Sequence, residues 1–163
     1  MSAIKKILVP TDFSEASKAA LRYACELATA TNASLCILHA VENPYRLGGF
    51  PEYYSLSQDY SEQFERSARR ELEGLLETVL TPDEAKQYRV RLVLRKGVAE
   101  QEILRYLQEH PDVDLVVMAT HGRGGVARLM MGSVADTLVR TARCPVLTIR
   151  VPDVEETKTT RAA

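Results

Sequence analysis

A glycine-containing loop between a buried apolar run and the last amphipathic segment carries residue types suited to binding phosphate. Residues 119–133 read ATHGRGGVARLMMGS, with two arginines and no acidic residue. Glycines let backbone N–H groups approach an anion closely, and Gly132-Ser133 precedes a helical pattern whose amino end attracts negative charge. The pattern predicts that a phosphate group binds at this loop.

A second loop, PTDFS at residues 10–14, follows the first apolar run and offers the carboxylate of Asp12. It contains no glycine, so the G-x-G-x-x-G fingerprint of dinucleotide-binding folds is missing from its required place. The G-x-x-x-x-G-K-[ST] phosphate loop is missing from the whole sequence, which argues against the common class of nucleoside triphosphatases. Asp12 remains as a hydrogen-bond acceptor at the end of a strand.

The elements that must position these loops alternate between strand and helix patterns. Apolar runs predict strands at residues 4–9, 34–41, 88–94, 114–119 and 145–151, the third of them half-exposed at a sheet edge. Helical spacing runs from residue 16 to Asn32, with Ser14 as the N-cap, and returns at residues 64–79, 99–107 and 134–142. Residues 42–57 are predicted to form a long connection, and a polar link follows Thr81 and Pro82.

This βαβαβαβαβ order predicts an α/β fold: a single doubly wound five-stranded parallel sheet, Rossmann-like, with strand order 3-2-1-4-5 and helices on both faces. Ligands of such sheets bind outside the carboxyl ends of the strands, where the strand order reverses. We expect one domain over residues 1–152 and a polar, disordered tail over residues 153–163.

The composition argues against several other classes of protein. With 45% apolar and 26% charged residues the chain is typical of a globular domain, and its net charge of -1 predicts attraction to neither nucleic acid nor an anionic membrane. No run approaches the roughly 18 to 20 apolar residues that span a bilayer, so we expect a cytoplasmic protein without membrane insertion. The three cysteines, Cys25, Cys36 and Cys144, are expected to be reduced core residues.

Several of these features resemble the universal stress protein family, whose ATP-binding members carry G-x-x-G, nine residues, then G-S or G-T after the fourth strand. Gly122, nine residues, Gly132 and Ser133 fit that motif, and Ala119 replaces its first glycine. The resemblance extends over almost the whole chain, including residues 10–14, 38–41 and 144–147. Because alanine is the smallest side chain that can replace glycine, we expect weakened or unchanged binding rather than none.

The resemblance implies a role for each matching position. Adenine is expected against the backbone of Ala40 with Pro10 and Thr11 nearby, and Met118 can touch its ring. The ribose hydroxyls are expected near Asp12 and Ala119, and the phosphates at Gly122, Gly132, Ser133 and Val134. A divalent metal, Mg²⁺ or Mn²⁺, is expected to be held mainly through phosphate oxygens.

Purely structural roles remain open for several of these residues. Ser133 through Asp136 also form a capping-box pattern, in which Ser133 would cap the last helix without a ligand. Asp12 can cap the turn into the first helix. His39, His110 and His121 have no catalytic companions in the sequence and are expected to be structural. Arginines in loops are more often solvated than bound to phosphate, so Arg123 and Arg128 are not assigned to the ligand. Tyr45, Tyr53 and Tyr54 either cover a ligand or pack on the surface.

The function expected from these features is that of an ATP-binding sensor or regulator of stress responses with slow or no hydrolysis. A nucleotide-free dimeric interaction protein and a weak ATPase or phosphotransferase are the alternatives. The last strand, from Pro145 to Arg150, leaves an unpaired edge, which predicts a homodimer through antiparallel pairing with a second copy. A further protein partner fits the same hypothesis.

Overall fold

The protein folds as one sheet with two layers of helices. The structure, a computed structural model, describes residues 3–42, 53–120 and 131–150, and the side chains of residues 53–61 are not described. Five parallel strands pair in the order β3-β2-β1-β4-β5. They are β1 (Lys6–Pro10), β2 (Ser34–Val41), β3 (Arg91–Lys96), β4 (Leu115–Ala119) and β5 (Val146–Ile149). The predicted fold class and strand order are confirmed, whereas the predicted tail at residues 153–163 lies outside the described residues.

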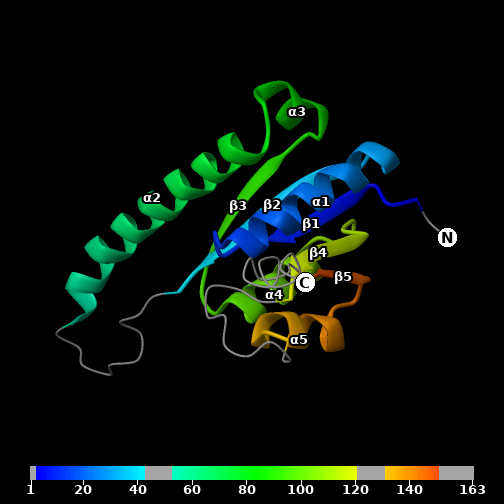
Figure 1. Cartoon of the computed structure of the whole chain (residues 1–163). Helices are drawn as coiled ribbons and strands as arrows, with labels where there is room; N and C mark the ends of the chain where they lie inside the picture. Colours follow the sequence, from blue (N-terminus) through cyan, green and yellow to red (C-terminus); the bar gives the residue numbers. More distant parts are fainter. Residues whose placement is uncertain (1–2, 43–52, 121–130, 151–163) are drawn as a thin grey trace, which may run out of the picture.

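Two helices pack on each face of the sheet (Figure 1). One face carries α1 (Glu15–Thr31) and α2 (Tyr53–Val79), and the other carries α4 (Ala99–Glu109) and α5 (Ser133–Thr141). A short helix, α3 (Pro82–Gln87), connects α2 to β3. The alternation of helices between the faces follows from right-handed crossovers on either side of β1.

Strand periodicity divides the core into two halves. On the central strand, Ile7 and Val9 face α1 and α2, whereas Leu8 faces α4 and α5. The same alternation continues on β2 and β4, because successive side chains of a strand point to opposite faces. All five residues of β4 are buried, as expected of a strand near the centre of a sheet covered on both faces.

The predicted ends of the first helix are confirmed. The Ser14 hydroxyl accepts the Ser17 backbone N–H at 3.1 Å, and Asn32 ends the helix in the left-handed conformation with φ of 55°. An N-cap bond of this kind stabilises a helix by about 1 kcal/mol. The cap fixes where the chain leaves the β1–α1 loop, and therefore where Asp12 lies.

Two of the predicted connections are wrong. The helix α2 begins at Tyr53, inside the segment predicted to be a long connection, because no glycine or proline lies between residues 52 and 73 to interrupt it. The polar link after Thr81 contains α3, which has a capping box between Thr81 and Glu84 and proline at its first position. The strand β3 accordingly starts at Arg91 rather than at residue 88, since Tyr88 caps α3.

No helix within the described ranges is both long and apolar enough to cross a membrane. The cysteines of the described residues carry free thiols, with Cys25 and Cys36 buried in the core and Cys144 partly buried. Burial raises the pKa of the Cys25 thiol to about 11, which keeps it protonated and unreactive at neutral pH.

Candidate functional site

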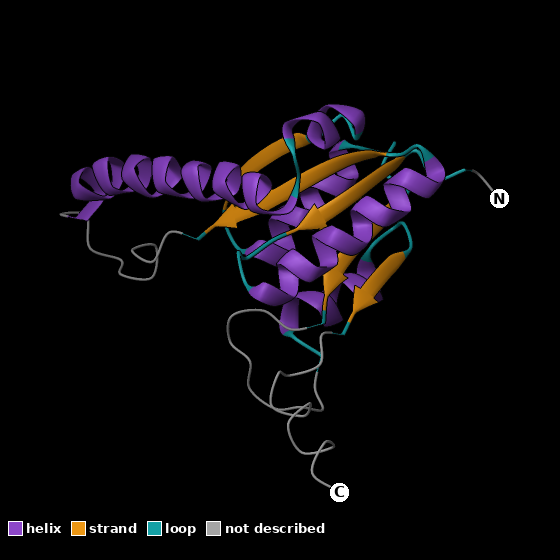
Figure 2. Cartoon of the chain, turned by 45° about the horizontal axis from the view of Figure 1, so that its top comes forward, coloured by secondary structure: helices purple, strands orange, loops and turns teal. Residues whose placement is uncertain are grey.

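A cleft of about 950 Å³ opens at the carboxyl ends of the strands, on the side toward which the strand arrows point (Figure 2). This volume lies within the range of about 300–1,000 Å³ found for small-molecule and cofactor sites. The wall comes from the β1–α1 loop, the ends of β2 and β4, the start of α5, and one face each of α2 and α4. The cleft therefore lies where the strand order reverses.

Pro10 explains why the sheet opens at this place. The β1–β2 ladder continues to Pro10 opposite Leu38, whereas the β1–β4 ladder ends at Leu8 opposite Val116. Backbone groups alternate sides along a strand, and the Thr11 N–H points to β2, so the nitrogen of Pro10 points to β4. Proline has no N–H to donate there, and the two strands part beyond it.

The β1–α1 loop is held rigidly by hydrogen bonds that start from Thr11. Its backbone N–H donates to the Leu38 carbonyl at 2.9 Å. Its hydroxyl accepts the Phe13 N–H at 3.1 Å and shares a hydrogen bond of 3.0 Å with the Ser17 hydroxyl. Thr11 and Ser17 are both buried, so these bonds also satisfy polar groups that water does not reach.

Asp12 lines the cleft while it stabilises its own loop. Its Oδ1 accepts the Ser14 backbone N–H at 3.1 Å and the Ser14 hydroxyl at 2.5 Å. This turn leads directly into α1, so the structural role considered for Asp12 from the sequence is confirmed. The same carboxylate forms part of the cleft wall, and a ligand role for it stays a prediction.

Phe13 occupies a backbone conformation that non-glycine residues rarely adopt. Its φ is 66°, and such strain persists only when the surroundings enforce it. Its ring packs against the His39 imidazole, with 4.3 Å between the ring centroids, and Nδ1 of His39 lies 2.8 Å from the Thr11 carbonyl oxygen. His39 thus has the structural role expected from the sequence, as does His110, whose ring packs on Tyr106.

The amino end of α5 forms the opposite end of the cleft. Gly132 is the N-cap, because its carbonyl accepts the Asp136 N–H at 2.9 Å, and its own N–H donates to the Thr120 carbonyl at 2.8 Å. Ser133 is the first helical residue, and no side chain caps this helix. The structural alternative considered for Ser133, a cap of this helix, is therefore not what the structure shows, since the N-cap falls one residue earlier. The first N–H groups of a helix have no partners within it, and residues 132–135 line the cleft.

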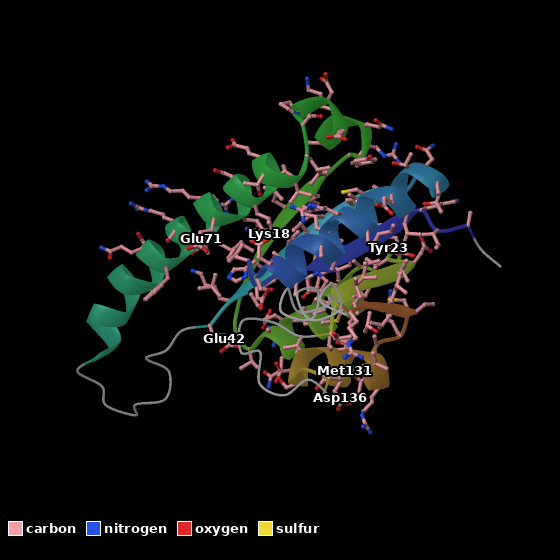
Figure 3. The ribbon with its side chains drawn as sticks, viewed as in Figure 1. Lys18, Tyr23, Glu42, Glu71, Met131 and Asp136 are labelled. Atoms are coloured by element: carbon pink, nitrogen blue, oxygen red, sulfur yellow. The ribbon has the colours of Figure 1, made fainter. Side chains whose placement is uncertain are left out.

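Carboxylates dominate the charge of the described wall. Asp12 lies on the β1–α1 loop, and Figure 3 shows Glu42 at the end of β2 and Glu71 on α2. Among the residues that the structure describes in this wall, none is a lysine or an arginine. The described ranges also contain no group of three or more histidine, cysteine, aspartate or glutamate side chains that could hold a metal ion. Among the described residues of this wall, backbone N–H groups are therefore the main donors that could meet an anionic ligand.

The cleft gathers most of the residues predicted from the sequence. Those that line it are Pro10, Thr11, Asp12, Ala40, Met118, Ala119, Gly132, Ser133 and Val134. Gly122 lies outside the described residues, as do His121, Arg123, Arg128 and Tyr45. Met118 and Ala119 are buried at the end of β4, so one side of the cleft floor is apolar.

Sequence reasoning missed the contributions of two helices. Phe64, Ser67, Ala68 and Glu71 of α2 and Ala99 and Ile103 of α4 also line the cleft. The α2 residues are spaced at i, i+3, i+4 and i+7, which places them on one face of a helix. That spacing is visible in the sequence, but nothing there indicates that the face turns toward the strand ends.

Comparison with known proteins identifies the family. The family model described as the universal stress protein family matches residues 3–150. The chain belongs to the universal stress protein family. Within it, a universal stress protein A homolog of Coxiella burnetii is 33% identical over 147 residues, which cover 89% of this chain and 95% of that protein.

Solved structures of universal stress proteins share the fold. One from Lactobacillus plantarum matches with a TM-score of 0.79 at 24% identity, covering 92% of this chain and all of that one. Another universal stress protein, solved in complex with cAMP, matches with a TM-score of 0.55 at 23% identity over 91% of this chain and 98% of that one. At these identities the structures establish the common architecture of the universal stress protein domain.

Proposed function

We propose that this universal stress protein binds ATP in the cleft and acts as a nucleotide-dependent sensor or regulator with slow or no hydrolysis. The observation that carries the proposal is the arrangement of the cleft, which has the start of α5 at one end and the end of β2 at the other. A nucleotide likewise has two chemically different ends, with phosphates at one end and a flat base at the other.

The phosphates are assigned to the start of α5. The backbone N–H groups of Ser133, Val134 and Ala135 follow the N-cap Gly132, and the positive end of a helix dipole favours anions by roughly 0.3–1 kcal/mol. The Ser133 hydroxyl makes no capping bond and can donate to a phosphate oxygen. Gly122 is assigned to the phosphates from the sequence motif alone.

The ribose and the base are assigned to the middle and the far end of the cleft. Asp12 lies on the loop after β1, beside the end of β4 where Ala119 is buried, and a carboxylate accepts ribose hydroxyl protons. Ala40 lies near the end of β2, Pro10 ends β1 and Thr11 follows it, and Met118 and Ile103 supply apolar contacts. A base placed there would contact apolar side chains, which predominate in the small-molecule sites of proteins.

A divalent cation fits the charges of this site through the nucleotide rather than through a protein cage. The described wall presents Asp12, Glu42 and Glu71 and neither lysine nor arginine, so bare triphosphate would meet unfavourable charge. Mg²⁺ binds substrate phosphates with one or two carboxylates and several waters. When bound, it would neutralise part of the phosphate charge.

A nucleotide-free interaction protein is the second candidate. It is favoured by Ala119, whose methyl group replaces a motif glycine where the ribose is assigned. In either case we propose a homodimer through the outer edge of β5, together with an unidentified protein partner. The cytoplasmic location expected from the sequence stays a prediction.

The test is mass spectrometry and calorimetry of the freshly purified protein. ATP that copurifies, or that binds to the stripped protein in the presence of Mg²⁺, supports the proposal, and cAMP and AMP serve as competitors because one universal stress protein was solved with cAMP. Absence of both copurified nucleotide and binding heat would favour the interaction protein. Turnover of about 1 per second or faster would contradict the proposed slow hydrolysis.

A further inference from the structure

The last rung of the β1–β2 ladder is irregular. The backbone N–H of Thr11 donates to the Leu38 carbonyl at 2.9 Å, as a parallel ladder requires. In such a ladder the next bond runs from the N–H two residues beyond Leu38, that of Ala40, to the Thr11 carbonyl. The Thr11 carbonyl oxygen instead has Nδ1 of His39 at 2.8 Å.

The His39 ring is the donor in this contact, because a carbonyl oxygen only accepts hydrogen bonds. Nδ1 must therefore carry a proton. The ring is held in place by its packing against Phe13, with 4.3 Å between centroids. His39 thus takes the acceptor that the strand geometry reserves for the backbone of Ala40.

Because His39 is the donor to the Thr11 carbonyl, the backbone N–H of Ala40 is not used in the ladder. On β2, the Ser34 N–H donates to the Lys5 carbonyl and the Leu38 carbonyl accepts the Thr11 N–H. Every second residue of β2 therefore directs its backbone groups toward β1. Ala40 lies two residues after Leu38, so its N–H points to that side as well. Ala40 lines the cleft. Among the described residues, the bonds outside regular strands and helices include none donated by this N–H.

We infer that His39 is a positioning residue that bonds the Thr11 carbonyl in place of the strand and so leaves the Ala40 N–H available to a base. The inference rests on the proposed nucleotide function. An N–H donor recognises an acceptor nitrogen on the edge of a base, as adenine has at N1, and is mismatched to guanine, whose N1 carries a proton. A site that hydrogen-bonds its ligand in this way rejects mismatched analogues strongly.

The first test compares ATP and GTP binding to His39→Phe and His39→Asn by calorimetry. Phenylalanine keeps a ring against Phe13 but has no donor, whereas the side-chain amide of asparagine places an N–H close to the position of Nδ1. We expect His39→Phe to weaken ATP binding about tenfold with little change for GTP, and His39→Asn to restore much of the preference. Tyr88→Phe, which removes a hydrogen bond of 2.9 Å to Thr29, is the matched control outside the cleft.

The second test needs no nucleotide and measures hydrogen exchange of the Ala40 amide. In His39→Phe the Thr11 carbonyl lacks its side-chain donor, so the Ala40 N–H should complete the ladder and exchange at least tenfold more slowly than in the native chain. A loss of ATP and GTP affinity in equal proportion, or an Ala40 amide already protected in the native protein, would overturn the inference. If the native protein binds no nucleotide, the proposed function fails, and the exchange measurement still decides the role of His39.

Discussion

One carboxylate oxygen of Asp12 accepts two hydrogen bonds from Ser14, from the backbone N–H at 3.1 Å and from the hydroxyl at 2.5 Å. Ser14 in turn caps α1. The loop that forms part of the cleft wall is therefore coupled to the start of α1, a helix whose inner face is buried in the core. A change at Asp12 is therefore expected to alter the stability of this loop in addition to any effect on the proposed ligand binding.

Asp12→Asn should separate these two effects. Asparagine retains an oxygen acceptor for Ser14, so the free energy of unfolding should fall by less than about 1 kcal/mol. The loss of the charge and of one acceptor should weaken ATP binding about tenfold. Calorimetry with ATP and with 2′,3′-dideoxy-ATP measures the ribose contribution, and an unchanged ratio of the two affinities would show that Asp12 does not contact the ribose.

Ser133→Ala should weaken binding of the triphosphate without destabilising the protein. Ser133 is the first residue of α5 and makes no capping bond, so the Tm should stay within about 1 °C, and ATP affinity should fall about threefold to tenfold. Thr81→Ala provides the opposite control: it removes the capping box of α3 and should cost about 1 kcal/mol of stability with no effect on ATP. A lowered Tm for Ser133→Ala would contradict the assigned N-cap.

Ala119→Gly should tighten ATP binding about threefold. The methyl group of Ala119 is buried at the end of β4, beside the position assigned to the ribose. Glycine within a strand lowers stability by roughly 0.5–1 kcal/mol, so affinity and Tm should change in opposite directions. Calorimetry and thermal unfolding of one preparation measure both, and unchanged affinity would place the ribose away from residue 119.

Thr148→Pro should yield a monomer with an intact fold. The Pro145 and Ile149 carbonyls accept bonds from β4, so by alternation the N–H of Thr148 points to the outer edge of β5. Proline there removes an edge donor without breaking the β4–β5 ladder. Light scattering at micromolar concentration reports the mass and circular dichroism the fold. A native protein that is already monomeric would exclude the proposed dimer.

The pKa of Glu84 should respond to the cap of α3. The backbone N–H of Thr81, and then its hydroxyl, hold the pKa of this carboxyl below its ordinary value of 4.5. A lowered pKa in the folded protein stabilises the fold above the ordinary value, and this contribution is lost as the pH falls below about 4.5. Thr81→Ala removes the hydroxyl but keeps the backbone N–H, so it should raise the Glu84 pKa only part of the way toward the ordinary value in a carbon-detected NMR titration. Asp112, whose pKa is lowered by Lys6, should titrate as before.

The sheet was predictable because its signals are local. The apolar runs of β2 and β4 and the cap residues Ser14 and Asn32 are visible in the sequence, and the crossover rule orders the strands. The capping box of α3 is also a local signal, T-P-D-E at residues 81–84. The prediction of a polar link did not take it into account.

The site was predictable only where a motif marks it. Asp12, Gly132 and Ser133 belong to recognisable loops. The contacts of His39 were not predictable from the sequence, because its bond to Thr11 and its packing on Phe13 depend on how two neighbouring strands end. The cap of α5 shows the same limit, since Gly132 and Ser133 are both plausible N-caps and only the backbone angles of the folded chain distinguish them.

The early end of the β1–β4 ladder makes the mouth of the cleft a property of the backbone. The strands separate where the tertiary amide nitrogen of Pro10, which carries no hydrogen, replaces a backbone N–H, whatever side chains the loops carry. The loops on either side can therefore exchange residues and alter ligand preference, while the opening between the strands keeps its place. A chain with alanine at position 10 could close that seam by one hydrogen bond, which makes this proline the residue that sets where the sheet stops.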